Sequence, residues 1–198
     1  MTLLPIIIGI VAVLALATLL IYNRMVSRRN AVDNSWAQIE VALQRRHDLI
    51  PNLVESVKGY AKHEQQTFEE VTKARSTAVA AKAPGTQAAA EDTLTGAVGR
   101  LMAVAEQYPE LRATENFQQL QSQLSETEDQ IAITRRVYND TVQTYNTLIQ
   151  IFPPSVIANA FNFEPRQFFD APKEAEATPE VSFDGGEPES PKAQASKR

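Results

Sequence analysis

The chain has 198 residues, a formal net charge of −5 and no cysteine. This length fits one ordinary domain with additional ends, and the mild negative charge argues against a protein that binds nucleic acid through a basic surface. Without cysteine the chain cannot form a disulfide, a thiolate metal site or a cysteine nucleophile. Glycine is scarce, at 7 residues, while Ala, Gln, Glu, Leu and Arg are abundant, so the composition favours helices.

An uninterrupted apolar segment lies near the N-terminus. Residues Leu3 to Tyr22 carry no charge, and as a helix they would be about 30 Å long, enough to span a bilayer. We therefore predict a transmembrane anchor over residues 1–23. A cleaved signal peptide is the competing interpretation, because Ala15 and Ala17 have cleavage-site spacing; however, no basic residue precedes the segment and apolar residues continue past Ala17. Arginines follow the segment at once, so the positive-inside rule predicts an external N-terminus and a cytoplasmic remainder at the inner membrane.

Apolar residues after the anchor recur at alternating steps of three and four, the spacing of a heptad seam. Three runs keep this spacing, within residues 32–78, 90–111 and 117–152. Each run is long enough to form a helix that packs through one apolar stripe. The pattern therefore predicts an all-α fold, in which an N-terminal transmembrane helix is followed by an antiparallel bundle of three to four long helices with a short C-terminal helix.

Prolines mark where these runs are expected to end. Pro84-Gly85 supplies a helix stop and a turn after the first run, and Pro109 marks the end of the second. Pro153-Pro154 stops the third run, after which Ser155 would cap the short C-terminal helix. The aromatic segment that ends at Phe169 is expected either to cover an end of the bundle or to form an exposed patch for a partner.

Pro51 interrupts the first run without disturbing its phase. A helix that continues through Pro51 should kink and leave the carbonyl of His47 in need of another donor. The alternative is a new helix that begins at Asp48 as N-cap, with Pro51 in its first turn. Because the heptad spacing of apolar residues keeps the same phase on both sides of the proline, the pattern favours one kinked helix.

The two histidines, His47 and His63, do not form a metal site. On a straight helix they would lie about 24 Å apart along the axis and about 160° apart around it. The sequence has no Glu-x-x-His pair of the kind that di-metal carboxylate bundles use. Both histidines fall off the seam, where a solvated surface position is expected. No motif of a nucleophile, phosphate loop or dinucleotide site is present, so we predict no enzyme activity and no cofactor.

Charged residues lie on or beside the seams, where burial demands a partner. Arg46 and Glu64 interrupt the first seam, and Glu128 and Arg135 flank the third. The structural interpretation is interhelical ion pairs that set the register of the bundle; the functional interpretation is a recognition or switching network. The first is the more usual case for charges in such positions.

Two long blocks, residues 22–64 and 120–169, resemble the LemA family of bacterial membrane-anchored proteins. The family-like signatures within them include Arg45-Arg46, Asp48-Leu49-Ile50-Pro51-Asn52-Leu53, Gly59-Tyr60-Ala61, His63-Glu64, Thr127-Glu128, Arg135, Tyr138-Asn139, Tyr145-Asn146 and Phe152-Pro153. The resemblance implies one N-terminal transmembrane helix and a helical bundle, and it supplies no catalytic residues. One departure is Asn162, which stands where family members commonly carry glycine and which can still adopt a left-handed conformation.

These observations predict three parts: the anchor at 1–23, a LemA-like bundle at 24–169 and a disordered acidic tail at 170–198. The expected function is a membrane-anchored, non-enzymatic scaffold that presents helix faces to an unidentified protein partner, with self-association as a further option. A sensor that relays through Pro51 and a carboxylate-dependent enzyme are the alternatives. The candidate structural or interaction residues are Arg46, Asp48, Pro51, Asn52, Glu64, Glu128, Arg135, Tyr138 and Asn139.

Overall fold

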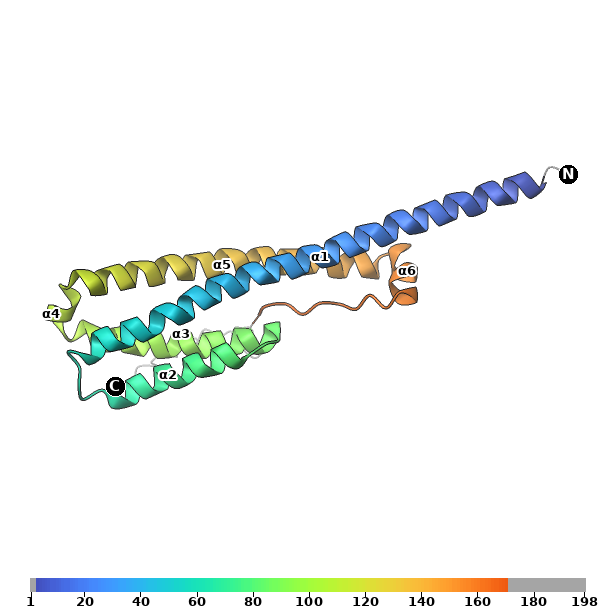
Figure 1. Cartoon of the computed structure of the whole chain (residues 1–198). Coiled ribbons are helices and arrows are strands. Elements are labelled where there is room, and N and C mark those ends of the chain that lie inside the picture. Colours follow the sequence, from blue (N-terminus) through green and yellow to red (C-terminus); the bar gives the residue numbers. More distant parts are fainter. Residues whose placement is uncertain (1–2, 171–198) are drawn as a thin grey trace, which may run out of the picture.

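The structure, a computed structural model, describes residues 3–170, and the predicted acidic tail lies almost wholly outside this range. The described part is helical and contains no strand. Its elements are α1 (Leu3–Lys58), α2 (Gln65–Ala80), α3 (Pro84–Glu106), α4 (Pro109–Arg112), α5 (Glu115–Gln150) and α6 (Pro154–Ala160). The predicted all-α bundle is confirmed. Four of these helices are long, and two short ones lie at the ends of α5 (Figure 1).

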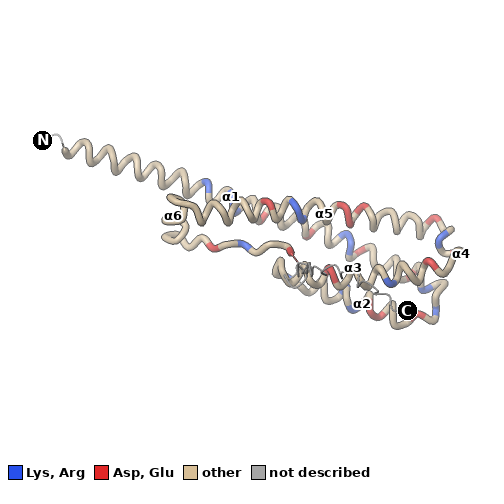
Figure 2. Tube along the Cα trace, turned by 180° about the vertical axis from the view of Figure 1, so that it is seen from behind, with Lys and Arg blue, Asp and Glu red and all other residues tan. Residues whose placement is uncertain are grey.

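The first part of α1 projects beyond the bundle (Figure 1). Its apolar side chains are exposed. Leu3 is 73% and Leu20 is 62% exposed. This projecting part carries no charge until the bundle begins (Figure 2). The helix is long and apolar enough to cross a membrane.

The first heptad run forms two helices rather than one, which corrects the expectation of a single helix as far as residue 78. α1 ends at Lys58, and α2 begins at Gln65 and folds back beside α3. The turn is closed by bonds from the amides of Tyr60 and Ala61 to the carbonyl of Val57, at 3.0 and 2.9 Å. Periodicity did not reveal this turn, because both helices face the same core and the turn keeps the apolar spacing. Tyr60 lies in this turn and is 43% exposed, although it falls within the first heptad run.

α1 runs through Pro51 as one helix, so the predicted continuity of this segment is confirmed. The carbonyl of His47, which Pro51 cannot serve, accepts a bond of 2.6 Å from Nε of Arg75 on α2. The backbone carbonyl that Pro51 leaves without a donor in α1 is therefore hydrogen-bonded by a side chain of α2.

The core divides into two apolar clusters along the bundle. One cluster joins the C-terminal part of α1 to α2, α3 and the first part of α5, and includes Ile50, Leu94 and Leu124. The other joins the middle of α1 to the second half of α5 and to the chain after α6, and includes Leu43 and Tyr145. α2 and α3 cover only one half of the α1–α5 pair (Figure 1). The other half is covered by α6 and the segment that follows it.

The C-terminal part of the fold differs in detail from expectation. Pro153 occupies the N-cap position of α6 and Ser155 lies inside the helix, so Ser155 is not the cap. Phe152, expected on the third seam, is 82% exposed, whereas Phe169 is buried. Asn162 has φ 54°, so the left-handed conformation foreseen for it is confirmed.

Candidate functional site

Arg46 is the centre of a buried polar network between the two apolar clusters. Its Nη1 donates to Glu91 Oε2 at 2.9 Å, and its Nη2 lies 2.7 Å from Glu128 Oε1. Nη2 also donates to Thr95 Oγ1 at 2.7 Å. The Arg46 side chain is only 2% exposed, and its Nε has no acceptor among residues 3–170. The guanidinium is thus held through its two terminal nitrogens by residues of α3 and α5.

His47 belongs to the same network, which overturns the expectation that it is a surface histidine. The residue is 4% exposed, and its Nε2 lies 2.7 Å from Glu91 Oε1. Because a carboxylate only accepts, Nε2 carries the proton of this bond. Gln87 Nε2 donates to the same oxygen and to the carbonyl of Ala78, both at 3.0 Å. The expectation for His47 was wrong because an off-seam position on α1 becomes buried once α2 and α3 pack beside it.

The pKa values of the two carboxyls of the network shift in opposite directions, although burial raises both. Burial on its own raises the pKa of Glu91, but the hydrogen bond and charge of His47, the charge of Arg46 and the Gln87 bond together hold that pKa below 4.5. The pKa of Glu128 is raised, because burial and the nearby negative charge of Glu91 outweigh the Arg46 contact. Glu91 is therefore the ionised partner on which the buried guanidinium depends.

The network connects four helices at one level of the bundle. Its members come from α1, α3 and α5, while α2 contributes the Arg75 bond to the His47 carbonyl and the Ala78 carbonyl. Arg46, His47 and Glu91 are all at least nine-tenths buried, which suits a role in helix register rather than in chemistry on a substrate. Within residues 3–170 no group of three or more metal-ligating side chains is placed to hold an ion.

A second constellation binds the chain after α6, which we call the strap and define as residues 163–170. The strap has no regular secondary structure and runs along α5. Tyr138 OH donates to the carbonyl of Gln167 at 2.8 Å, and Arg135 Nε donates to the carbonyl of Phe169 at 3.0 Å. Asn139 accepts from the amide of Phe169 at 2.9 Å and donates to its carbonyl at 3.3 Å. Predicted residues from α5 thus converge on the backbone of the strap.

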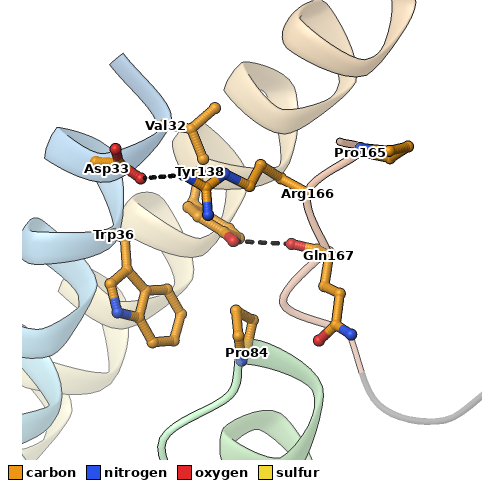
Figure 3. A pocket seen from close by; sticks show the side chains of 8 residues that line it. All are labelled: Val32, Asp33, Trp36, Pro84, Tyr138, Pro165, Arg166 and Gln167. Carbon is orange, nitrogen blue, oxygen red and sulfur yellow. Dashed lines mark hydrogen bonds and ion pairs between the residues drawn. The ribbon is translucent and has the colours of Figure 1, made fainter. Parts of the chain in front are cut away.

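A cavity of ≈ 310 Å³ lies where the strap meets α1, α5 and the start of α3. At its rim, Arg166 Nη2 donates to Asp33 Oδ1 at 3.1 Å (Figure 3). The ring of Trp36 lies 5.3 Å from that of Tyr138. Its lining residues are Val32, Asp33, Trp36, Pro84, Tyr138, Pro165, Arg166 and Gln167.

The remaining predicted residues join neither constellation. Asp48, Pro51 and Asn52 are exposed on α1, and Asp48 accepts a bond of 2.8 Å from Gln44 of the same helix. Glu64 is half-buried in the N-cap position of α2, without a side-chain capping bond. The assignment of Glu64 to the seam of a continuous helix was wrong, because the chain turns between residues 58 and 65.

Glu91 was not among the predicted site residues, and Tyr145 and Asn146 were named only as family-like signatures. Arg46 lies on α1 and Glu91 on α3, with α2 between them in the chain, so no local spacing could connect the two residues. Tyr145 and Asn146 did carry a signal, since the dipeptide Tyr-Asn occurs at residues 138–139 and again at 145–146. The repeat is one heptad, and it places both pairs on one face of α5.

The structure therefore defines an all-helical bundle protein whose first helix is long and apolar enough to cross a membrane. The sequence model described as the LemA family matches residues 35–183, most of the chain, and the chain belongs to this family.

Relatives of this chain include proteins with two kinds of name. Magnetosome protein MamQ 2 of Paramagnetospirillum magneticum is 29% identical, over 89% of this chain and 75% of its own length. Magnetosome protein MamQ of Magnetospirillum gryphiswaldense is 27% identical, over 82% and 70%. Protein LemA of Metamycoplasma hominis is 27% identical, over 75% and 68%. Neither the family description nor these names states an enzymatic activity.

Proposed function

We propose that this protein is a membrane-anchored scaffold that presents its helical bundle to another protein and performs no chemistry of its own. The observation that carries the proposal is the continuity of α1, which runs from Leu3 to Lys58 without a break. The same helix exposes an apolar segment of bilayer length and forms the bundle core through Ile39, Leu43 and Ile50. Any protein bound to the bundle would thereby be held at a fixed place beside the membrane.

The proposed division of the chain is an anchor at 1–23, the bundle at 24–169 and a tail from residue 170. The proposed orientation places the N-terminus outside and the bundle in the cytoplasm, since Arg24, Arg28 and Arg29 follow the apolar segment. Reporter fusions at each terminus test this orientation. We expect a C-terminal cytoplasmic reporter to be active, and activity only of an external reporter at that end would contradict the orientation.

In-cell photocrosslinking tests the scaffold function. A photoreactive residue at Val137, which is 45% exposed on α5, should capture one reproducible protein from membranes. The same probe at Leu124, which is 7% exposed in the core, is the matched control. If Val137 and four further exposed positions on α1 and α5 capture only what the control captures, the scaffold proposal fails.

A sensor is the second candidate, and the Arg75 bond to the His47 carbonyl favours it. This bond couples α2 to α1 at the turn of the helix that Pro51 weakens. A partner that moved α2 would change the course of the helix that leads to the membrane. Replacing Pro51 by Ala should then alter the cellular output at normal protein level, and unchanged output would rule the sensor out.

A further inference from the structure

The strap is held mainly through its backbone, in a repeating manner. Tyr145 OH donates to the carbonyl of Glu164 at 3.0 Å. Asn146 donates to the carbonyl of Arg166 at 2.9 Å and accepts from the amide of the same residue at 2.8 Å. The tyrosine thus bonds to the carbonyl of one strap residue. The asparagine bonds to both the carbonyl and the amide of the residue two positions later.

Tyr138 and Asn139 repeat this arrangement three strap residues later. Tyr138 contacts the carbonyl of Gln167, and Asn139 contacts both backbone groups of Phe169. The offset between tyrosine and asparagine contacts is again two residues along the strap. We call each Tyr-Asn dipeptide with its strap contacts a rung.

The spacing of the rungs follows from simple geometry. Seven residues of α5 advance about 10.5 Å, and three residues of extended chain advance about 10 Å. The heptad of the helix therefore matches a three-residue step of an extended peptide that runs in the opposite direction. The second rung fixes the register of the strap along α5 through backbone hydrogen bonds alone, with no contact to a strap side chain. Grooves that bind extended peptides of varied sequence use backbone bonds in the same way.

Specific recognition comes instead from two phenylalanines of the strap, six residues apart. Phe163 is 9% exposed, with its ring 5.7 Å from that of Tyr22 and the guanidinium of Arg29 5.3 Å from its centre. Phe169 is 2% exposed, and its ring lies 5.9 Å from that of Trp36. Buried aromatic side chains at both ends would anchor a peptide while the rungs hold the backbone between them.

Between these anchors, Arg166 points toward Asp33 of α1. Its guanidinium pairs with Asp33 of α1 beside the cavity of ≈ 310 Å³ (Figure 3). This pair is about half exposed, so it favours a basic side chain at this position without requiring burial of a charge. Helices α1 and α5 also pack directly against each other beneath the strap, and Phe163 and Phe169 complete the same apolar cluster.

We propose that the groove between α1 and α5 is a peptide-binding site for a partner protein, and that the strap occupies it in cis. The partner segment is extended, carries two phenylalanines six residues apart and has a basic residue midway between them. This inference rests on the proposed scaffold function and names the chemistry of its partner. Release of the strap and entry of the partner segment would be alternative states of one groove.

The test uses the full chain in detergent with the strap released in two ways. Replacing Phe163 and Phe169 together by Ala empties both aromatic sites. Separately, Arg166→Pro removes the backbone amide that donates to Asn146 Oδ1. Circular dichroism and cooperative melting establish which variants keep the fold. The probe is a fluorescent peptide of residues 161–170, FNFEPRQFFD, read by polarisation. The matched control peptide carries Ala at both anchor positions.

We expect the peptide to bind a folded release variant at least tenfold more tightly than it binds the unmodified chain. Adding Asn139→Ala and Asn146→Ala should weaken that binding at least tenfold, whereas the exposed control Gln143→Ala should leave it unchanged. If the double-Ala variant loses its fold, the exposed Arg166→Pro substitution decides. Any of three results would overturn the proposal: no binding to a folded release variant, equal binding of the control peptide, or binding that ignores both asparagines.

A release variant that dimerises yet fails to bind the peptide would assign the groove to a second copy and overturn a heterologous partner. The scaffold function itself is judged by the photocrosslinking experiment above. Capture of a membrane protein at Val137 with no peptide binding would therefore retain the scaffold and reject the groove. Failure of both would reject the scaffold as well.

Discussion

Arg46 Nη1 lies 2.9 Å from Glu91 Oε2, and the two side chains are only 2% and 6% exposed. An arginine in this setting remains charged, so its stability in the core depends on the carboxylate beside it. The pair stands at the level where one apolar cluster ends and the other begins, between Leu43 and Ile50 on α1. It gives α1 and α3 one favoured register, because a helix slipped by one turn would bury the guanidinium without its partner.

Glu91→Gln should therefore lower the free energy of unfolding by about 3–5 kcal/mol, since it leaves the Arg46 charge buried beside a neutral amide. Urea unfolding of the purified chain in detergent measures the change. Glu128→Gln is the matched control, because Glu128 contacts the same guanidinium but its side chain is 40% exposed. We expect that control to cost about 1 kcal/mol or less. Equal losses in both variants would contradict the dependence on Glu91.

Pro51 and Arg75 should behave as a coupled pair. Arg75→Ala leaves the His47 carbonyl without its donor and should cost about 1–3 kcal/mol. Pro51→Ala restores an amide that can bond to this carbonyl within α1, and should stabilise the fold by up to about 3 kcal/mol. In the Pro51→Ala background, loss of Arg75 should cost under about 1 kcal/mol. A double-mutant cycle by urea unfolding measures the coupling. Additive effects would show that the 2.6 Å bond from Arg75 does not compensate for the donor that Pro51 removes.

The decrease in the free energy of unfolding at acid pH should depend on Glu91. Its folded-state pKa lies below the ordinary 4.5, so its contribution is present above about pH 4.5 and is lost as pH falls through the folded value. Glu128 acts in the opposite sense: with its pKa raised, its contribution falls as pH rises from 4.5 through the folded value. Measured from about pH 7 to about pH 3, stability should lose much of its acid dependence in Glu91→Gln. An unchanged decrease at acid pH in that variant would refute this assignment.

The strap should detach at alkaline pH. Burial raises the pKa of Tyr138 and of Tyr145 above 10.0, so their contribution is full below pH 10 and is lost as pH rises through the folded values. Trp36 is the only tryptophan of the chain and lies 5.9 Å from Phe169, so its fluorescence reports the strap. Tyr138→Phe with Tyr145→Phe should abolish the alkaline change, while Tyr60→Phe, at an exposed site, should keep it. If the alkaline change in Trp36 fluorescence persists in the double variant, it does not arise from ionisation of Tyr138 or Tyr145.

Much of the fold was accessible from local patterns. The uncharged run from Leu3 to Tyr22, the heptad spacing and the phase across Pro51 predicted a projecting apolar helix, a bundle and a helix that continues through the proline. The turn between Lys58 and Gln65 was not predicted, because the apolar spacing of α1 resumes on α2 after the turn. Asn162 was understood correctly, since a left-handed residue depends on its own side chain and its nearest neighbours.

The two constellations were accessible only in part. Arg46 and Glu128 could be named as charges near a seam that demand partners, yet the dominant partner, Glu91, comes from α3 and was not considered. His47 was expected in solvent because its position was judged on one helix alone. The Tyr-Asn repeat was visible as a heptad echo, but nothing in it indicated that the opposite element would be an extended strap.

Local sequence is enough to predict most of the helical segments, the apolar face of each and the segment that can enter a membrane, because these properties depend on residues within a few turns of one another. The tertiary structure decided which charges pair, that α1 and α2 reverse direction, and that residues 163–170 lie along α5. Those outcomes depend on the rotation and axial register of helices far apart in the chain, and on an extended segment whose hydrogen bonds are made with another element. Neither the register between distant helices nor the position of an extended segment produces a periodic pattern in the neighbouring sequence.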